Sequence, residues 1–173
     1  MLVALSGTPG VGKTTVTQIL RERGHRVLAI NQVAEENNLV VGYDEERETK
    51  IIDVDALDDF IVKEFENDNI IIEGHLSHLL SVDLTIILRC DPFVLKERLK
   101  GKGWSEKKVK ENIGAEILDV IKVEALENME RVFEVDTTLL PPQKVADSIE
   151  EILNGKYKEP NINWLDKYEY LLF

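Results

Sequence analysis

The sequence predicts an α/β fold in which a five-stranded parallel sheet lies between helices on both faces. Short apolar runs alternate along the chain with segments whose apolar residues recur at helical spacing, a pattern typical of a parallel sheet. A glycine-rich motif directly follows the first apolar run. At 173 residues the chain has the length of one domain, so we expect residues 1–173 to form a single domain.

The expected strands are short and rich in Val, Leu and Ile, which suits strands buried on both faces. They are residues 1–6, 25–30, 70–72, 84–89 and 131–135. The expected helices are residues 14–23, 32–38, 55–66, 92–100, 106–128 and 141–153. Residues that favour helix starts precede three of them: Asp53 or Asp55, Asp91 with Pro92, and Ser105. The ligand of such a sheet is expected at the carboxyl ends of its strands.

Residues 7–14, Gly-Thr-Pro-Gly-Val-Gly-Lys-Thr, match the phosphate-binding pattern G-x-x-x-x-G-K-[ST]. Its glycines allow tight turns that aim backbone N–H groups at an anion, and the helix that follows adds the positive end of its dipole. Lys13 is expected to reach the β- and γ-phosphates of ATP, and the Thr14 hydroxyl to bind Mg²⁺. A chance glycine-rich turn is the alternative, and the strand–loop–helix context argues against it.

A second group of candidate residues, Glu73-Gly74-His75, follows the strand expected at 70–72. Because the carboxyl ends of parallel strands share one edge of a sheet, these residues are expected to lie beside the phosphate loop. Glu73 can hold Mg²⁺ through water or orient an attacking water, and His75 can move protons near neutral pH. An ordinary strand-end carboxylate and a structural histidine are the alternatives.

Phosphoryl transfer also needs positive groups that spread the charge of the transferring phosphate. The chain offers Lys13, Arg89, Arg98 and Lys102, with Arg47 as a further candidate. For Arg89 and Arg98, a salt bridge or a pairing along a helix is an equally good interpretation. The expected catalytic residues are Lys13, Glu73, His75 and Arg98.

Most of the net charge of −12 lies in one fifth of the chain. Between Glu35 and Asp68, thirteen acidic residues stand against Arg47, Lys50 and Lys63. Such a surface repels free nucleic acid, so no direct nucleic-acid binding is expected, and it attracts a basic partner. A charged face that only keeps the protein soluble is the alternative.

Several features are typical of a cytoplasmic protein. The single cysteine, Cys90, excludes an internal disulfide framework and fits a reducing compartment. No apolar run approaches the ~18 residues of a membrane span, and the first strand leaves no room for a signal peptide. We therefore expect a cytoplasmic protein with no membrane partner.

Two stretches interrupt the alternation and are expected to be inserts in the sheet scaffold. Residues 31–54 include a loop expected over 40–48, and residues 101–111 begin with the helix-breaking run Gly-Lys-Gly-Trp. Small nucleotide kinases carry an acceptor-binding insert and a mobile lid at such places. Closure of such a lid excludes water from the transferring phosphate.

Over residues 1–155 the chain resembles the adenylate kinase isoenzyme 6 family, atypical adenylate kinases and ATPases of small-ribosomal-subunit assembly. The matching motifs are GTPGVGKTT, VGYDEE, an acid-x-His at a strand end, LR-x-D, and G-W-S-E-K-K-V-x-E-N-I-x-x-E-I. The resemblance implies a P-loop nucleoside-monophosphate-kinase-like three-layer fold. A content of 31 % charged residues leans towards a thermophile, so an archaeal member is the natural expectation.

The resemblance also implies an activity and a set of site residues. The expected enzyme converts ATP and AMP into two ADP and hydrolyses ATP, so AMP or water is the acceptor and Mg²⁺ is required. Residues 31–54 become the monophosphate-binding insert and residues 101–111 the lid. The expected ATP contacts are Gly10, Gly12, Lys13, Thr14, Thr15 and Lys102, and the expected metal contacts are Thr14 and Glu73.

In this family the ATPase acts late in small-subunit rRNA maturation, on the pre-ribosomal small subunit, with a basic small-subunit ribosomal protein as partner. The acidic stretch is consistent with such a partner. Three positions depart from the family. Glu73 stands where Asp is usual, Glu35 where an Arg for the monophosphate is frequent, and Lys102 where the lid usually has Arg.

Two other classes of function share these features. A metabolic kinase of a small hydroxylated or nucleotide substrate, without a ribosomal role, has the same loop, sheet and lid, although Glu35 argues against it. A non-catalytic nucleotide switch uses ATP only to reshape a protein-binding surface. Turnover measured with and without AMP separates the two enzymes from the switch.

Overall fold

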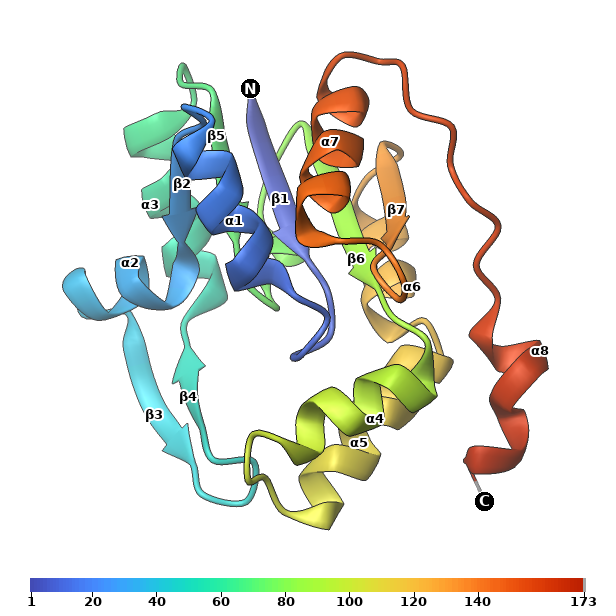
Figure 1. Cartoon of the computed structure of the whole chain (residues 1–173). Helices are drawn as coiled ribbons and strands as arrows, with labels where there is room; N and C mark the ends of the chain where they lie inside the picture. The colour runs from blue at the N-terminus through green and yellow to red at the C-terminus, as the bar shows by residue number, and fades with distance from the viewer. Residues whose placement is uncertain (173) are drawn as a thin grey trace.

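The computed structural model describes residues 1–172, so Phe173, the last aromatic residue of the tail, lies outside it. A five-stranded parallel sheet forms the centre of the molecule in the order β2-β5-β1-β6-β7 (Figure 1). The strands are β1 (Leu2–Ser6), β2 (Val27–Ala29), β5 (Ile70–Glu73), β6 (Leu84–Arg89) and β7 (Val132–Asp136). The predicted fold class is confirmed, and β1, which carries the phosphate loop at its end, is the central strand.

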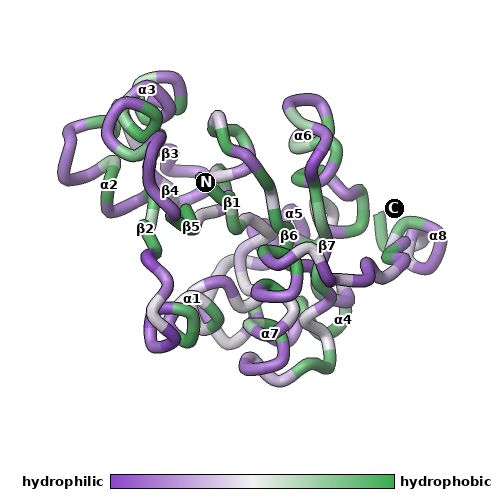
Figure 2. Tube along the Cα trace, turned by 90° about the horizontal axis from the view of Figure 1, so that it is seen from above, coloured by the Kyte–Doolittle hydropathy of each residue, from purple (hydrophilic) through white to green (hydrophobic). Residues whose placement is uncertain are grey.

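Helices cover both faces of this sheet. They are α1 (Lys13–Glu22), α2 (Ile30–Glu36), α3 (Val54–Phe65), α4 (Pro92–Lys100), α5 (Glu106–Ile117), α6 (Val120–Asn128), α7 (Pro142–Leu153) and α8 (Trp164–Tyr168), with 3₁₀ turns at Ser77–Leu79 and Glu169–Leu171. Seen from above, α1 and α7 lie on one side of the strands, and α3 and α6 on the other (Figure 2). In residues 1–172, no helix is long and apolar enough to span a membrane.

Alternating side chains of the buried strands supply two separate hydrophobic clusters. Val3 and Leu5 of β1 and Ile71 of β5 join the cluster that includes α1 and α7. Leu2 of β1, with Ile70 and Ile72 of β5, joins the cluster under α2 and α3. Because successive residues of a strand point to opposite faces, continuous apolar runs fill both layers at once.

Residues 40–48, predicted to be a loop, instead belong to an antiparallel hairpin, β3 (Val40–Asp44) and β4 (Thr49–Ile52). This hairpin forms its own two-stranded sheet beside the main one (Figure 1). Val41 and Tyr43 are exposed, and a register shift occurs between Val40 and Gly42. The alternation that marks a half-buried strand is therefore weak, and Gly42 resembled a loop signal.

The single helix predicted over residues 106–128 is also wrong, because the structure divides it into α5 and α6. Asp119 has a φ of 55°, in the left-handed region, which ends the first helix. Its carboxylate pairs with Arg89, and Arg89 Nη2 donates a hydrogen bond of 3.0 Å to the Glu116 carbonyl in the last turn of α5. Neither glycine nor proline marks this break, although aspartate tolerates the left-handed region, and Arg89 stabilises the ending that the structure shows.

The aromatic tail packs on the body of the protein. Trp164 and Tyr168 of α8 are buried, and the Tyr168 hydroxyl donates a 2.5 Å hydrogen bond to Asp91 at the start of α4. Earlier in the tail, the Tyr157 hydroxyl donates to the Glu134 carbonyl of β7 at 3.0 Å. The tail thus runs past the edge strand of the sheet and ends against α4 and α5.

Candidate active site

The phosphate loop joins β1 to α1 and approaches its neighbours so closely that it needs glycine. At Gly7, φ is 140°, and a Cβ atom would lie 2.5 Å from the Leu88 carbonyl oxygen of β6. At Gly10, φ is 95°, and a Cβ atom would lie 2.7 Å from Leu99 Cδ2 of α4. Side chains at these positions would push the loop away from both elements.

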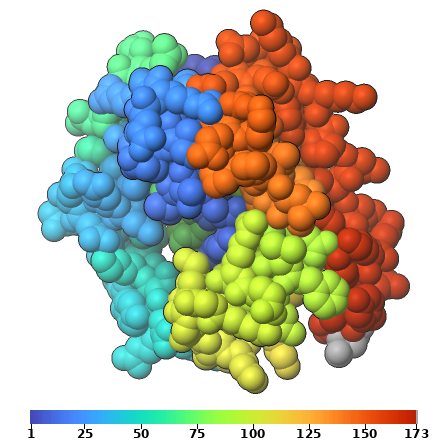
Figure 3. All heavy atoms as spheres, in the orientation of Figure 1, coloured from blue at the N-terminus to red at the C-terminus, as the bar shows by residue number. Residues whose placement is uncertain are grey.

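A cavity of about 530 Å³ lies over this loop. Its walls include all the expected catalytic, ATP-binding and metal-binding residues: Gly10, Gly12, Lys13, Thr14, Thr15, Glu73, His75, Arg98 and Lys102. Figure 3 shows the recess between the hairpin residues, the residues around 100–110 and the N-terminal segment at its floor. The fold thus brings together residues from three distant parts of the chain.

Lys13 is a buried positive charge at the floor of the cavity. Its Nζ donates hydrogen bonds to the backbone carbonyls of Gly7 at 2.5 Å and Thr8 at 3.3 Å. Burial lowers the pKa of Lys13 to about 8, against the opposing effect of Glu73 and Glu116. The ammonium group therefore stays largely protonated at pH 7, held by carbonyl oxygens from which an anion can draw it.

Arg98 reaches the cavity from α4, as the sequence predicted, and is held by backbone oxygens. It donates to the carbonyl of Val11 in the phosphate loop at 3.3 Å and to that of Thr137 at 3.0 Å. Thr137 lies directly after β7, and its hydroxyl donates to the same Val11 carbonyl at 2.8 Å. These contacts fix a guanidinium group between the phosphate loop and the end of the sheet.

Lys102 follows α4 and is exposed, and its Nζ lies 5.6 Å from the ring centroid of Trp104. Lys108 stacks on the same ring at 4.4 Å. The predicted lid segment thus places two cations on an aromatic side chain at the rim of the cavity.

Glu73 and His75 lie at the end of β5, beside the end of β1, where Leu5 is in register with Glu73. Burial, with smaller effects from Lys13 and His78, lowers the pKa of His75 to about 4. His75 is therefore neutral at physiological pH in the ligand-free protein. The predicted proton exchange near neutral pH does not fit this environment, because a partly buried imidazole beside a lysine resists a second positive charge.

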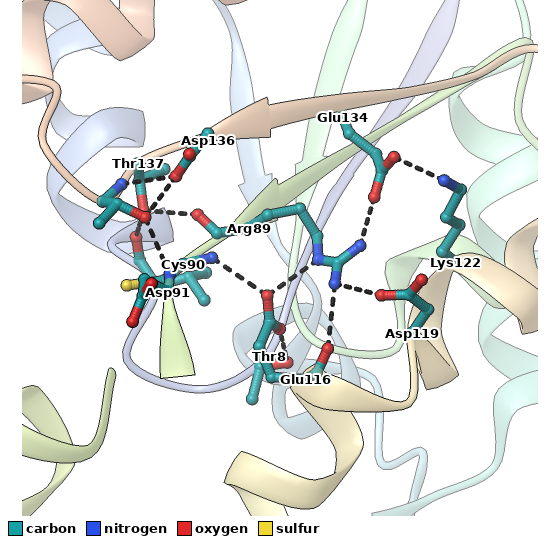
Figure 4. A network of polar contacts seen from close by, with 12 residues as sticks. Thr8, Arg89, Cys90, Asp91, Glu116, Asp119, Lys122, Glu134, Asp136 and Thr137 are labelled. Carbon is teal, nitrogen blue, oxygen red and sulfur yellow. Dashed lines mark hydrogen bonds and ion pairs between the residues drawn. The ribbon is translucent and has the colours of Figure 1, made fainter. Parts of the chain in front are cut away.

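Arg89, which the sequence offered as a charge for the transferring phosphate, lies outside the cavity. It is only 2 % exposed and pairs with Glu116, Asp119 and Glu134, while Lys122 bonds the other oxygen of Glu134 at 2.6 Å (Figure 4). Its guanidinium group is fully used by these acids. The salt-bridge interpretation is therefore correct for Arg89.

A second cavity of about 640 Å³ adjoins the first and shares Pro9, Asn31, His75 and Trp104 with it. Its further walls come from the phosphate loop, the hairpin, α5 and α6, and include Thr8, Arg47, Thr49, Lys108, Glu111, Asn112 and Glu124. Sequence reasoning missed most of these residues. Trp104, Lys108 and Asn112 could have been found from the sequence, because they belong to the family motif G-W-S-E-K-K-V-x-E-N.

In residues 1–172, no group of three or more His, Cys, Asp and Glu side chains is arranged to hold a metal ion. The Thr14 hydroxyl and the Glu73 carboxylate nevertheless line the same cavity. Both are oxygen donors, and Mg²⁺ in nucleotide sites takes only one or two protein ligands besides water and phosphate oxygens. The donor set thus fits an ion that arrives with its nucleotide.

Comparisons with known proteins agree with this architecture. A family model described as "AAA domain" matches residues 3–119. A protein of Archaeoglobus fulgidus named "Putative adenylate kinase" is 47 % identical over 175 residues, which cover 98 % of this chain and 94 % of the relative. A protein of Methanocaldococcus jannaschii with the same name is 42 % identical over 175 residues, covering 99 % and 97 %.

Two solved structures share the fold at low sequence identity. Shikimate kinase from Bacteroides thetaiotaomicron has a TM-score of 0.60 and 18 % identity, covering 89 % of this chain and 98 % of its own. The YorR protein of Bacillus subtilis, solved with phosphorylated GDP, has a TM-score of 0.59 and 18 % identity, covering 89 % and 96 %. These likenesses show a kinase-type α/β fold. The family model and the archaeal relatives lead to one conclusion: the chain belongs to the AAA domain family, together with those relatives.

Proposed function

We propose that this protein is an adenylate kinase-like phosphotransferase that moves the γ-phosphoryl group of ATP to AMP or, more slowly, to water. The observation that carries the proposal is the pair of adjoining cavities. The first lies over the phosphate loop, and the second lies between the hairpin and α5. A donor in one and an acceptor in the other would meet where the cavities share His75 and Trp104, and this arrangement supports direct transfer. The name of the archaeal relatives points in the same direction.

In this proposal the ATP triphosphate occupies the phosphate loop. Gly10, Gly12, Thr14 and Thr15 offer backbone N–H groups at the start of α1, and Lys13 leaves its carbonyl partners for the β- and γ-phosphates. Thr14 and Glu73 would hold Mg²⁺, which neutralises charge on the phosphates when bound. Gly7 and Gly10, earlier in the loop, allow the tight turns that shape the triphosphate site.

Arg98 and Lys102 supply the remaining positive charge around the transferring group. Arg98 is preorganised by the Val11 and Thr137 carbonyls, whereas Lys102 lies on the exposed segment 101–111, the proposed lid. A fixed cation needs little reorganisation during transfer, and a mobile one can close over the bound nucleotide. Glu73 can accept a proton from the acceptor, whereas neutral His75, which lines both cavities, can orient the acceptor through a hydrogen bond.

The proposed acceptor insert, residues 31–54, is more balanced locally than its total charge suggests. Glu35, at the position where the resemblance implies an arginine for the monophosphate, pairs with Lys50 at 2.6 Å. Arg47 and Lys108 both line the second cavity. Arg47 pairs with Asp44 at 3.3 Å and with Glu111 at 4.0 Å, but its side chain is 68 % exposed, so a phosphate can compete for it. Together with Lys108 it supports AMP as acceptor.

Steady-state turnover of Mg-ATP, with and without AMP, tests the proposal. We expect ADP formation to rise at least about tenfold with AMP. Lys13→Met should lower turnover by at least about tenfold, because it removes the charge on the β- and γ-phosphates but keeps the aliphatic stem. Lys96→Met, at an exposed position on α4, is the matched control and should leave turnover unchanged.

The outcomes separate the candidate functions. ATP binding without turnover under either condition would indicate a nucleotide switch. Turnover that ignores AMP but responds to another small acceptor would indicate a metabolic kinase. Unchanged turnover and unchanged Mg-ATP binding in Lys13→Met would contradict the assignment of the phosphate loop.

We further propose a role in small-ribosomal-subunit assembly and rRNA maturation through a basic ribosomal protein. The support is the sequence resemblance together with the acidic stretch between Glu35 and Asp68, which forms the hairpin and α3 on one side of the molecule. The phosphate loop is built from other segments, whereas the hairpin also lines the second cavity, so α3 is the part of the stretch that can be tested without changing the acceptor site.

A further inference from the structure

We propose that Glu116 is a positioning residue that holds the phosphate loop in register with the helix lining the second cavity. This inference rests on the proposed transfer between the two cavities. The contact that carries it joins Thr8, the second residue of the loop, to Glu116 near the end of α5. Thr8 Oγ1 donates a hydrogen bond of 2.5 Å to Glu116 Oε2, and the two residues are only 2 % and 3 % exposed.

The other oxygen of the same carboxylate is fixed by the end of β6 (Figure 4). Glu116 Oε1 accepts hydrogen bonds from Arg89 Nε at 2.8 Å and from the Cys90 backbone N–H at 3.0 Å. One buried side chain therefore joins the phosphate loop, the central sheet and α5. Because both oxygens are occupied and charge-assisted, the carboxylate has little freedom to move.

Thr8 is well placed to transmit this constraint to the phosphate site. Its carbonyl accepts hydrogen bonds from Lys13 Nζ and from the Val11 backbone N–H, both at 3.3 Å. The Thr8 side chain thus anchors the turn that holds the ammonium group and shapes the cradle. Thr8 also lines the second cavity, so it lies between the two proposed substrates.

Helix α5 transmits the constraint to the other substrate. Lys108, Asn112 and Glu116 follow one another at intervals of four, so they lie along one face of the helix. Lys108 and Asn112 line the second cavity. Fixing Glu116 to Thr8 therefore fixes the acceptor-facing side chains relative to the phosphate loop.

The need to neutralise the charge of Arg89 does not by itself explain why Glu116 also contacts the phosphate loop. Asp119 and Glu134 also pair with Arg89, and neither has a hydrogen bond to the phosphate loop in the described structure. Balancing the charge of Arg89 does not require the hydrogen bond between Thr8 and Glu116. This difference between Glu116 and Asp119 gives the experiment its control.

Four variants separate positioning from structural support. Thr8→Val removes the donor and keeps the shape of the side chain, and Thr8→Ser keeps the hydroxyl. Glu116→Gln keeps the shape and removes the charge. Asp119→Asn weakens the same arginine cluster without touching the loop. For each, we would measure Mg-ATP affinity by calorimetry, turnover with ATP and AMP, and hydrogen exchange of the backbone amides of residues 7–14.

We expect Thr8→Val and Glu116→Gln to speed hydrogen exchange in residues 7–14 and to lower turnover by about ten- to a hundredfold. Mg-ATP affinity should fall by less, because the loop can still close around a triphosphate but is held less accurately against the acceptor. Thr8→Ser should recover most of the turnover lost in Thr8→Val. Asp119→Asn should lower stability while keeping exchange in residues 7–14 and turnover close to wild type.

Unchanged hydrogen exchange in Thr8→Val would overturn the inference, as would wild-type turnover in that variant. Equal losses of turnover in Asp119→Asn and Glu116→Gln would reduce Glu116 to a structural role and also overturn it. A wild-type protein without turnover would contradict the proposed function instead. In that case, exchange in residues 7–14 of Thr8→Val and Thr8→Ser still decides whether the contact positions the loop.

Discussion

Arg89 and Arg98 show how the surroundings of a side chain decide its role. Both were possible charges for the transferring phosphate. Arg89 ends β6 and points into a buried cluster of three carboxylates. Within residues 1–172, Arg98 bonds only to hydroxyl and carbonyl oxygens, so it keeps its charge for the cavity. An arginine among acids is neutralised, but an arginine among neutral dipoles still attracts an anion.

This contrast predicts opposite defects for two similar substitutions. Arg89→Met should lower the free energy of unfolding by about 3–5 kcal/mol, because it leaves buried carboxylates without their partner. Arg98→Met should lower turnover at least about tenfold with a much smaller loss of stability. Urea unfolding and steady-state turnover on both variants check this. Equal losses of stability in the two variants would contradict it.

The lowered pKa of His75 predicts that the free energy of unfolding depends on pH. Its pKa is about 4 in the folded protein and 6.5 when unperturbed, so below pH 6.5 the unfolded chain binds a proton that the folded protein does not. The stability due to the neutral imidazole is thus complete above pH 6.5 and is lost as pH falls towards 4. Between pH 7 and pH 5 the loss should be about 2 kcal/mol.

His75→Gln should abolish this part of the loss, because glutamine does not titrate. Urea unfolding at pH 7 and pH 5, on the wild type and the variant, gives the difference directly. The buried His78 is present in both proteins, and the double variant with His78→Gln separates its contribution, because the two histidines affect each other's pKa. If the variant loses as much stability as the wild type between these pH values, His75 has an ordinary pKa.

At the scale of elements, α8 shows how the tail is attached. Tyr168 lies edge to face with Phe93 at 5.3 Å and donates to Asp91, while Lys167 bonds the same Asp91 oxygen at 3.1 Å. Asp91 also caps α4 by accepting from the Phe93 backbone N–H. The last helix therefore supports the start of the helix that carries Arg98, at a distance from both cavities.

Tyr168→Phe should accordingly lower the free energy of unfolding by about 1–3 kcal/mol, because Asp91 loses a buried partner. Turnover should stay within about twofold, since the Lys167 contact and the apolar packing remain. Tyr170→Phe, at a 60 % exposed position, is the matched control and should change neither property. A large fall in turnover in Tyr168→Phe at unchanged stability would show that the tail acts on the active site.

At the scale of the whole molecule, the negative charge is segregated from the phosphate site. The hairpin and α3 carry most of the acidic stretch, while the cavity floor is lined by Lys13 and Arg98. Within the stretch, Glu46 pairs with Lys107 and Asp44 accepts from the Arg47 backbone N–H, so these two acids hold the hairpin. The exposed acids of α3 are better suited to test the proposed basic partner.

Replacing Asp55, Asp59 and Glu64 of α3 with lysine should slow association with a basic small-subunit ribosomal protein. Exposed charges are screened over ~8 Å at physiological ionic strength, so wild-type association should weaken steeply as salt rises. ATP turnover should change far less. The control replaces Glu127, Glu130 and Glu151 with lysine, which makes the same change in net charge. These three residues are exposed and lie outside the acidic stretch.

Equal effects of the two triple variants would mean that only net charge matters. No complex at ~0.15 M salt, or one that ignores both salt and charge reversal, would leave the acidic stretch with a role in solubility alone. Titration of the purified pair across salt concentrations distinguishes these cases. The kinase chemistry is tested separately and does not depend on the result.

The sequence by itself determined the scaffold and pointed to the phosphate-loop residues, the strand-end pair and two of the cations that line the first cavity. Buried parallel strands need continuous apolar runs, so β6 was predicted at its observed bounds, residues 84–89. The phosphate motif has fixed spacing because backbone geometry requires it, and a strand end beside it brought Glu73 and His75 to the same edge. Local chemistry and the rules of parallel sheets were sufficient for these features.

Only the tertiary structure decided which charges are free, where the long helix breaks and what forms the second cavity. Asp119, at the end of α5, pairs with Arg89 of β6. Glu116 accepts a hydrogen bond from Thr8, which follows the neighbouring strand β1. The hairpin was not predicted because only Ile52 of its two strands is buried in the core, so the strands show no apolar face and depend on pairing with each other. These features depend on contacts between distant residues, and local propensity contains no information about such contacts.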